Sequence, residues 1–143
     1  MFFGEYEHQK DDKNRIRIPP KFKDELGKKL VFGKGLDGVI NVFPEEVMEK
    51  RAEAYYSTLN EFDEEAQAAY LEYMAAMFSV GEDKQGRVAL PDALVEYAGL
   101  GKDVVTVGLG DHIAIMSKEK REEQRSRRPF EASMKILSQK LKG

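Results

Sequence analysis

The sequence predicts an α+β protein, mainly β with helices, in which one β-rich unit occurs twice. The first observation is a repeat, because residues 11–19 and 83–91 share an Asp, an Arg, a final Pro and the alternating apolar positions between them. The second is that this alternation at period two is typical of a half-buried strand. The third is an acidic stretch with helical periodicity between the copies. The chain should therefore form two equivalent halves, a helical linker and a helical C-terminus.

Each copy of the repeat opens with a tight turn. Asp11 and Asp83 are expected to accept hydrogen bonds from the backbone that follows them. Asn14 and Gly86 occupy the position that requires a positive φ, which Gly adopts freely and Asn more readily than most residues. The Arg after each turn is thereby held at the surface by a rigid bend, which is a suitable place for an electrostatic anchor.

The first copy is predicted to contain four strands and one short helix. Residues 4–9 form the first strand, and residues 15–18 form its hairpin partner, which Pro19 ends. Pro20 begins the helix, and the Gly that follows residue 26 ends it. In chain order, this copy has strands at 4–9 and 15–18, a helix at 20–26, and strands at 30–32 and 39–43.

The linker and the second copy continue the pattern. Pro44 and the acids after it begin a helix to about residue 57, and Asn60 or Asp63 caps a second helix to about residue 78. The apolar stripe of this second helix favours core and subunit packing over a ligand or protein groove. In chain order, the second copy has strands at 79–82 and 87–90, a helix at 91–98, and strands at 104–107 and 113–116.

Two glycine-rich stretches, residues 33–35 and 108–110, each follow a predicted strand. Neither is followed by a helical pattern with Gly-Lys-Ser/Thr, which a phosphate-binding loop requires. We therefore interpret both as turns between strands.

The C-terminal tail is predicted to be helical in two parts. Ser117 caps a charged helix that ends near Arg128, because Pro129 follows. The second part has apolar side chains on one helical face: Phe130, Met134, Leu137 and Leu141. This face could dock on a neighbouring molecule, contact an anionic surface or fray, and the sequence does not choose among the three.

Composition limits the possible classes of function. The chain has 143 residues, is 41% hydrophobic and contains no Cys, which excludes disulfides, thiolate metal sites and a Cys nucleophile. Neither a secretory leader nor an apolar run of membrane-spanning length is recognised. We therefore expect a soluble cytoplasmic protein that uses no cofactor and does not contact the membrane.

Charge is segregated along the chain, although the net charge is only −3. Residues 1–34 carry nine Lys/Arg against six Asp/Glu, residues 37–83 carry two against twelve, and residues 84–143 carry twelve against eight. Both copies of the repeat lie mainly in basic stretches. The negative total therefore conceals a candidate basic face that suits an anionic partner.

Taken together, these residues resemble the MraZ family of bacterial transcription regulators, which are built from two AbrB-like (SpoVT-AbrB) modules. The resemblance covers essentially the full length, from Met1-Phe2 and Gly4-Glu5 through both Asp-turn-Arg motifs to the charged helix after Met116. It implies a pseudo-twofold, double-split β-barrel. In these terms the modules span residues 5–47 and 77–120, the helical linker 48–76 and the C-terminal helical tail 121–143.

The resemblance also implies a function. It implies binding to short G-rich direct repeats of double-stranded DNA upstream of the chain's own gene, at the head of the division and cell-wall cluster. It further implies repression of transcription, a homo-oligomeric ring of eight or more copies, and association with the nucleoid. The family's DNA-contacting arginines match Arg15 and Arg87 here. The positive charges expected to position the DNA backbone around them are Lys10, Lys13, Arg17, Lys21 and Lys84.

Three positions depart from the family's pattern. Asn14 replaces the Gly of the first turn, and Lys10 and Glu82 stand where an apolar residue usually precedes the Asp. Lys10 adds positive charge to the first turn, whereas Glu82 is expected to weaken the DNA contact of the second. Equal roles for the two copies therefore do not follow from the resemblance.

Two other classes of function compete with DNA binding. AbrB-like folds also serve as antitoxins, in which case the acidic segment 45–65 would bind a protein partner. An enzyme, such as a metal-dependent hydrolase that uses Asp11 and Asp83, is disfavoured because no acid, base and nucleophile converge in the sequence. His8 and His112, the only histidines, lack a partner at metal-ligand spacing, and we interpret them as surface residues.

Overall fold

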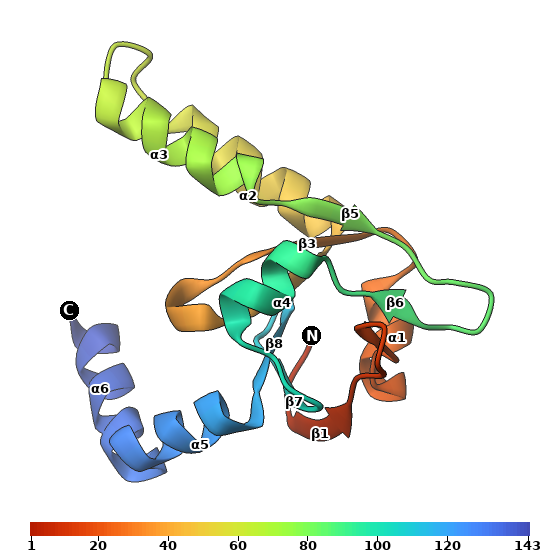
Figure 1. Ribbon diagram of the computed structural model, residues 1–143. Helices are drawn as coiled ribbons and strands as arrows, with labels where there is room; N and C mark the ends of the chain where they lie inside the picture. The colour runs from red at the N-terminus through yellow and green to blue at the C-terminus, as the bar shows by residue number, and fades with distance from the viewer.

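The computed structural model describes all 143 residues as two antiparallel sheets and six helices (Figure 1). The α+β class predicted from the sequence is confirmed. None of the helices combines the length and the apolar character that crossing a membrane requires. The strands are β1 (Glu5–Gln9), β2 (Arg15–Ile16), β3 (Leu30–Lys34), β4 (Ile40–Pro44), β5 (Phe78–Val80), β6 (Val88–Ala89), β7 (Asp103–Gly108) and β8 (Ile113–Ser117). The helices are α1 (Pro20–Leu26), α2 (Glu45–Ser57), α3 (Glu64–Ala75), α4 (Asp92–Ala98), α5 (Lys118–Arg127) and α6 (Phe130–Lys142).

The strand pairing is unchanged when the two halves of the chain are exchanged. The main sheet has the order β1-β7-β8-β4-β3-β5, and β2 pairs with β6 in the second sheet. The first strand of each half pairs with the third strand of the other, since β1 pairs with β7 and β5 with β3. The remaining cross-pairs join counterparts, β2 with β6 and β4 with β8. The repeat seen in the sequence therefore reappears in the topology.

The predicted hairpin between residues 4–9 and 15–18 is wrong beyond its turn. The turn closes, because the backbone N–H of Asp11 donates to the carbonyl of Arg15 at 2.9 Å. After it, β2 leaves β1 and pairs with β6. This pairing sets Ile16 opposite Val88, and both side chains are buried. The strands that follow the two turns thus bury their apolar faces in one shared core.

That core draws on both halves of the chain. It contains 17 buried residues, and Phe22 of α1 and Leu94 of α4 occupy corresponding places in it. Phe2, which precedes the first strand, also enters the core. Its ring meets that of Phe22 edge-on, with the ring centroids 5.8 Å apart. The two halves are therefore joined by packing as well as by strand pairing.

α2 and α3 form a helical hairpin that projects from the sheet (Figure 1). Of the two predicted caps, Asp63 is the one that begins α3, because its Oδ1 accepts from the backbone N–H of Ala66 at 3.1 Å. Tyrosine rings pack across the hairpin in two pairs. No residue of α3 is buried, so its apolar stripe does not belong to the core of this chain.

A cluster at the base of the hairpin attaches α2 to the sheet. Arg51 donates through Nη2 and Nε to the two carboxylate oxygens of Asp111, at 2.8 and 3.2 Å. The Arg51 guanidinium also lies 4.9 Å from the ring centroid of Phe43. His112 is buried and stacks on Phe43 with the ring centroids 4.7 Å apart. The interpretation of His112 as a surface residue is therefore wrong, because Phe43 of β4 gives its ring a stacking face.

This cluster predicts a pH-dependent contribution to stability. The hydrogen bond from Arg51 lowers the pKa of Asp111 to about 2, from an ordinary value of 3.8. A carboxyl whose pKa is lower in the folded state than in the unfolded state stabilises the fold. The contribution is complete when the pH is above the unfolded-state pKa, and it is lost as the pH falls through the folded-state pKa. Because Asp111 is half-exposed, we expect Asp111→Asn to cost at most about 1 kcal/mol at pH 7, or about 3 °C in Tm.

Thermal unfolding of both proteins from pH 7 to pH 2 measures this contribution. The difference in Tm should stay constant down to about pH 4 and shrink between pH 4 and pH 2, where the wild-type carboxyl takes up its proton. A difference that persists unchanged to pH 2 would assign the effect of the substitution to packing instead of charge.

Candidate nucleic-acid interface

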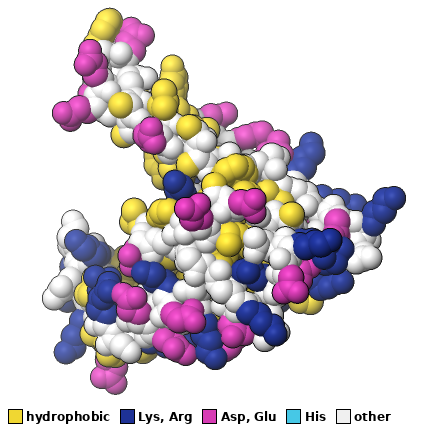
Figure 2. All heavy atoms as spheres, in the orientation of Figure 1, with side chains coloured by type: hydrophobic (Ala, Val, Ile, Leu, Met, Phe, Trp, Pro, Cys, Tyr) yellow, Lys and Arg dark blue, Asp and Glu magenta, His cyan; other side chains and the backbone are white.

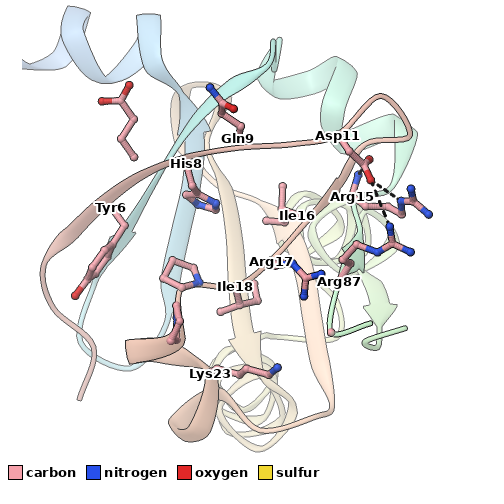
Figure 3. Close-up of a pocket in the computed structure, with 14 residues that line it drawn as sticks. Tyr6, His8, Gln9, Asp11, Arg15, Ile16, Arg17, Ile18, Lys23 and Arg87 are labelled. Atoms are coloured by element: carbon pink, nitrogen blue, oxygen red, sulfur yellow. Dashed lines mark hydrogen bonds and ion pairs between the residues drawn. The ribbon is translucent and has the colours of Figure 1, made fainter. Parts of the chain in front are cut away.

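The two Asp turns meet on one surface of the molecule, although 72 positions of sequence separate them. The pairing of β2 with β6 sets Arg15 opposite Ala89 and so brings Arg87 next to the first turn. Figure 3 shows the guanidinium groups of Arg15 and Arg87 side by side, next to Asp11. The strand exchange between the halves therefore creates a paired site from two single ones.

Hydrogen bonds from its own backbone shape the first turn. Asp11 Oδ1 accepts from the backbone N–H groups of Lys13 and Arg15, at 3.0 and 2.8 Å. The backbone N–H of Asn14 donates to the carbonyl of Asp11 at 3.1 Å, and Asn14 adopts a φ of 57°. These bonds fix the backbone at the residue that carries the guanidinium.

The second turn repeats this geometry. Asp83 Oδ1 accepts from the backbone N–H groups of Gln85 and Arg87, at 2.8 and 2.9 Å. Gly86 adopts a φ of 76°, which corresponds to Asn14 in the first turn. The replacement of Gly by Asn therefore leaves the bend of the first turn intact.

Each aspartate also orients the side chain of its arginine. Arg15 Nε donates to Asp11 Oδ2 at 2.7 Å, and Arg87 Nε donates to Asp83 Oδ2 at 2.9 Å. The Arg15 and Arg87 side chains remain 28% and 23% exposed. Because the bonded atom in each is Nε, the Nη groups of both arginines make no hydrogen bond within the site and keep donors for another acceptor.

The two aspartates are not equivalent, because Asp11 serves both arginines. Its Oδ2 lies 3.9 Å from Arg87 Nη1 in addition to its bond with Arg15. The pKa of Asp11 is lowered mainly by the hydrogen bond from the backbone of Arg15. The pKa of Asp83 is lowered in the same way by the backbone of Arg87. Both carboxylates therefore stay ionised at neutral pH and hold their arginines by charge-assisted bonds.

A cleft of about 550 Å³ lies beside the paired arginines (Figure 3). Arg17 lines it, and its guanidinium donates to the backbone carbonyl of Gln85 in the second turn. Lys23, a residue that the sequence reasoning did not select, also lines it and lies 3.5 Å from Glu82 through Nζ and Oε1. This ion pair places a positive charge beside Glu82, the residue that was expected to weaken the DNA contact of the second copy. No sequence signal links the pair, because α1 and the strand before the second turn meet only in the folded chain.

The other predicted positive charges are distributed around this site. Lys13 and Lys84 are exposed on the two turns, and Lys10 is half-buried just before the first. Lys21 does not line the cleft, and its Nζ lies 4.1 Å from the ring centroid of Phe3. Figure 2 shows Lys and Arg side chains gathered on the right-hand side of the molecule, over the region of β6 and the loop before it.

His8 lines the cleft but is not the surface residue that we predicted. It is half-buried, and its Nε2 lies 2.7 Å from Thr106 Oγ1. Burial lowers the pKa of His8, so the ring is neutral at physiological pH. The structure does not bring three His, Cys, Asp or Glu side chains together in an arrangement that could hold a metal ion.

The arrangement suits recognition of a polyanion. A guanidinium is a planar fork that can bridge two phosphate oxygens or pair with O6 and N7 of guanine in the major groove. Arg15 and Arg87 offer two such forks from rigid turns, and Lys13 and Lys84 add point charges at the rim. The two arginines are therefore suited to contact base edges, and the two lysines are suited to contact the phosphate backbone of a nucleic acid.

Comparison with known proteins relates nearly the whole chain to one family. Residues 1–71 and 74–139 match the model of the MraZ protein family, whose description also contains the term antitoxin-like. A protein of Clostridium acetobutylicum is 41% identical over 123 residues, which is 84% of each chain, and one of Carboxydothermus hydrogenoformans is 43% identical over 122 residues, which is 83% of this chain and 82% of that protein. A protein of Thermoanaerobacter sp. is 41% identical over 123 residues, which is 86% of this chain and 85% of that protein. All three carry the name transcriptional regulator MraZ.

Proposed function

This chain belongs to the MraZ family of transcriptional regulators. We therefore propose that it regulates transcription by binding double-stranded DNA through Arg15 and Arg87. The observation that supports this proposal most strongly is that the two guanidinium groups lie side by side, each fixed by an ionised aspartate. The proposal assigns no catalytic step to the protein. Its place of action would be the cytoplasm, at the nucleoid.

The proposed reading of DNA divides the site into two roles. Arg15 and Arg87 pair with guanines through their Nη groups, which suits short G-rich direct repeats upstream of the chain's own gene. Lys10, Lys13, Arg17 and Lys84 hold the phosphates on either side. Occupying such repeats would repress the gene cluster for division and the cell wall that follows.

A single copy offers few contacts, and each is weak and sensitive to salt. We therefore propose that the protein acts as a homo-oligomeric ring of eight or more copies, which meets repeated boxes on the DNA. Linking the copies raises the effective concentration of each site and increases affinity by about 100-fold or more. We further propose that each chain forms an AbrB-like double-split barrel, a view supported by the symmetric exchange of strands between its halves.

Selection of binding sites from random duplexes tests this function. The wild-type protein should enrich duplexes with repeated G-rich boxes, and a labelled duplex of the chain's own upstream region should bind more tightly than a shuffled duplex of the same composition. Equal affinity for both duplexes at every salt concentration would refute sequence-specific regulation.

The shared role of Asp11 predicts an unequal effect of two equivalent substitutions. Asp11→Asn keeps the turn, because the amide oxygen still accepts from the backbone, but it loses the charge that orients both arginines. We expect the ratio of specific to non-specific affinity to fall about tenfold for Asp11→Asn, because the charge that orients both arginines is lost. Asp83→Asn affects one arginine only and should reduce the ratio less.

Titration of both variants against the cognate and the shuffled duplex measures this ratio. Affinity for the shuffled duplex should rise slightly in both variants, because each removes a negative charge near the phosphates. Equal losses in the two variants would contradict a shared role for Asp11.

A second candidate function is binding of a protein partner through the α2–α3 hairpin, in the manner of an antitoxin. It is favoured by the exposure of large apolar side chains on this acidic element, and by the description of the family model. The exposed side chains are Tyr55, Tyr56, Phe62 and Leu71. Purification of a different protein in stoichiometric amount with the chain, together with no affinity for DNA, would favour this function over the first.

A further inference from the structure

The C-terminal helix α6 has an apolar face that nothing in this chain covers. No residue of α6 is buried, and the helix lies away from the sheet, beyond α5 (Figure 1). Its apolar residues recur at helical spacing and so form one stripe. Their exposed fractions are 75% for Phe130, 39% for Met134, 54% for Leu137 and 88% for Leu141. Exposed apolar area of this kind on a short helix is stabilised by docking into a groove.

The α2–α3 hairpin offers such a groove. A cleft of about 420 Å³ runs between its two helices and is lined almost entirely by apolar and aromatic side chains. Ala66 and Ala69 leave space in it beside the ring of Tyr73, which meets the ring of Tyr55 edge-on. Figure 2 shows hydrophobic and acidic side chains together on the outer part of this hairpin. The groove lining consists of Tyr55, Thr58, Leu59, Ala66, Ala69, Tyr70 and Tyr73.

The helix and the groove match in length and in charge. α6 has 13 residues and α2 and α3 have 13 and 12, so each is about 20 Å long. Residues 45–75 carry nine Asp/Glu against two Lys/Arg, whereas residues 127–143 carry five Lys/Arg against one Asp/Glu. Apolar contact in the centre and opposite charge at the rim is the usual pattern of a specific protein interface.

We propose that α6 of one copy lies in the α2–α3 groove of a neighbouring copy of this chain. This inference rests on the proposed function, because it names the contact that joins the copies of the oligomer. The two surfaces are different, so the contact is head-to-tail, and repetition around an axis closes it into a ring. An anionic membrane would satisfy α6 but would repel the acidic hairpin and leave its groove open, which favours a second copy as the occupant.

Complementation of two broken surfaces tests this contact. Leu137→Asp/Leu141→Asp damages the helix face and leaves the groove intact, whereas Ala69→Arg obstructs the groove and leaves the helix intact. Each variant alone should be monomeric by light scattering, with the 16.3 kDa mass of one chain. An equimolar mixture should give particles of two chains and no larger, because only one helix and one groove in each pair can engage. Circular dichroism establishes that both variants are folded. Leu109→Asp is the matched control, because Leu109 is exposed and lies outside both surfaces. This variant should assemble like the wild type.

Three results would overturn the contact. Either variant alone could assemble to the wild-type mass, or the mixture could contain only monomers. The wild type itself could also be monomeric, in which case α6 covers the groove of its own chain or remains free. Sedimentation of the wild type, but not of Leu137→Asp/Leu141→Asp, with vesicles of phosphatidylserine and phosphatidylcholine would assign α6 to the membrane and also overturn it.

The outcome for this contact is distinguishable from the outcome for DNA binding. The groove variant should bind a duplex with one box as the wild type does, and should bind a duplex with several boxes at least about tenfold more weakly, because the gain from linked copies is lost. A ring that assembles through α6 but binds no DNA would refute the proposed function alone. If both surface variants still assembled into the ring, and DNA binding still depended on the arginines, the α6 contact alone would be refuted.

Discussion

Substituting Ala for both Arg15 and Arg87 is expected to weaken binding to the cognate duplex by about 30-fold or more. Each guanidinium that pairs with a guanine contributes about 1–3 kcal/mol of discrimination, and about 1.4 kcal/mol corresponds to a factor of ten. The two side chains come from one paired site, so their losses accumulate within each chain. Affinity for a shuffled duplex should fall less, because only the charge is lost there.

Fluorescence anisotropy with both duplexes, at several salt concentrations, measures these affinities. Lys28→Ala/Lys29→Ala removes the same charge at exposed residues that do not line the cleft, and it should change the affinity less than fivefold. Arg15→Lys/Arg87→Lys keeps the charge but removes the fork, and it should behave like the double Ala variant on the cognate duplex. If the double Ala variant bound the cognate duplex as tightly as the wild type, the assignment of the site would be incorrect.

Gly108→Ala is expected to destabilise the protein by about 3 kcal/mol, the largest effect that we predict for a single methyl group. A Cβ at this position would lie 2.3 Å from the backbone N of Phe3 and 2.6 Å from the carbonyl carbon of Phe2. The segment cannot shift alone, because the Phe2 N–H donates to the carbonyl of Gly110 at 2.7 Å and the Phe2 ring is buried. The extra methyl group must therefore displace Phe2 from the core.

Urea unfolding of the two proteins measures the loss of stability. Gly101→Ala is the matched control, because a Cβ there has no atom within 4 Å and the backbone does not require a positive φ. It should change the free energy of unfolding by less than about 1 kcal/mol. A loss for Gly108→Ala as small as that of the control would show that the N-terminal segment does not pack on β7 in solution.

The site illustrates how much of its geometry is local. The bends at Asn14 and Gly86 and the bonds from Asp11 and Asp83 all join residues within four positions of one another. The caps of the helices and the helical C-terminus depend on similarly short spacings. Sequence reasoning could reach these features because each depends on the chemistry of a few neighbouring residues.

The errors have the opposite character. The interpretation of His112 as a surface residue missed its stacking on Phe43, and the ion pair between Glu82 and Lys23 was not foreseen. The stretch 108–110 was predicted to be a turn, but Gly108 is the last residue of β7, and the N-terminal backbone lies against it. Each of these contacts joins segments that lie far apart in the sequence, and no local pattern records them.

The sequence by itself determined the duplication, the α+β class, the bends and the two arginines that follow them. Only the tertiary structure decided which strands are partners, and thereby brought Arg15 and Arg87 to one surface around a shared Asp11. The physical reason is that period-two alternation specifies which face of a strand is buried but not the strand that lies beside it. The partner is selected by the burial of Ile16, Val88 and the rest of one common core, to which both halves of the chain contribute.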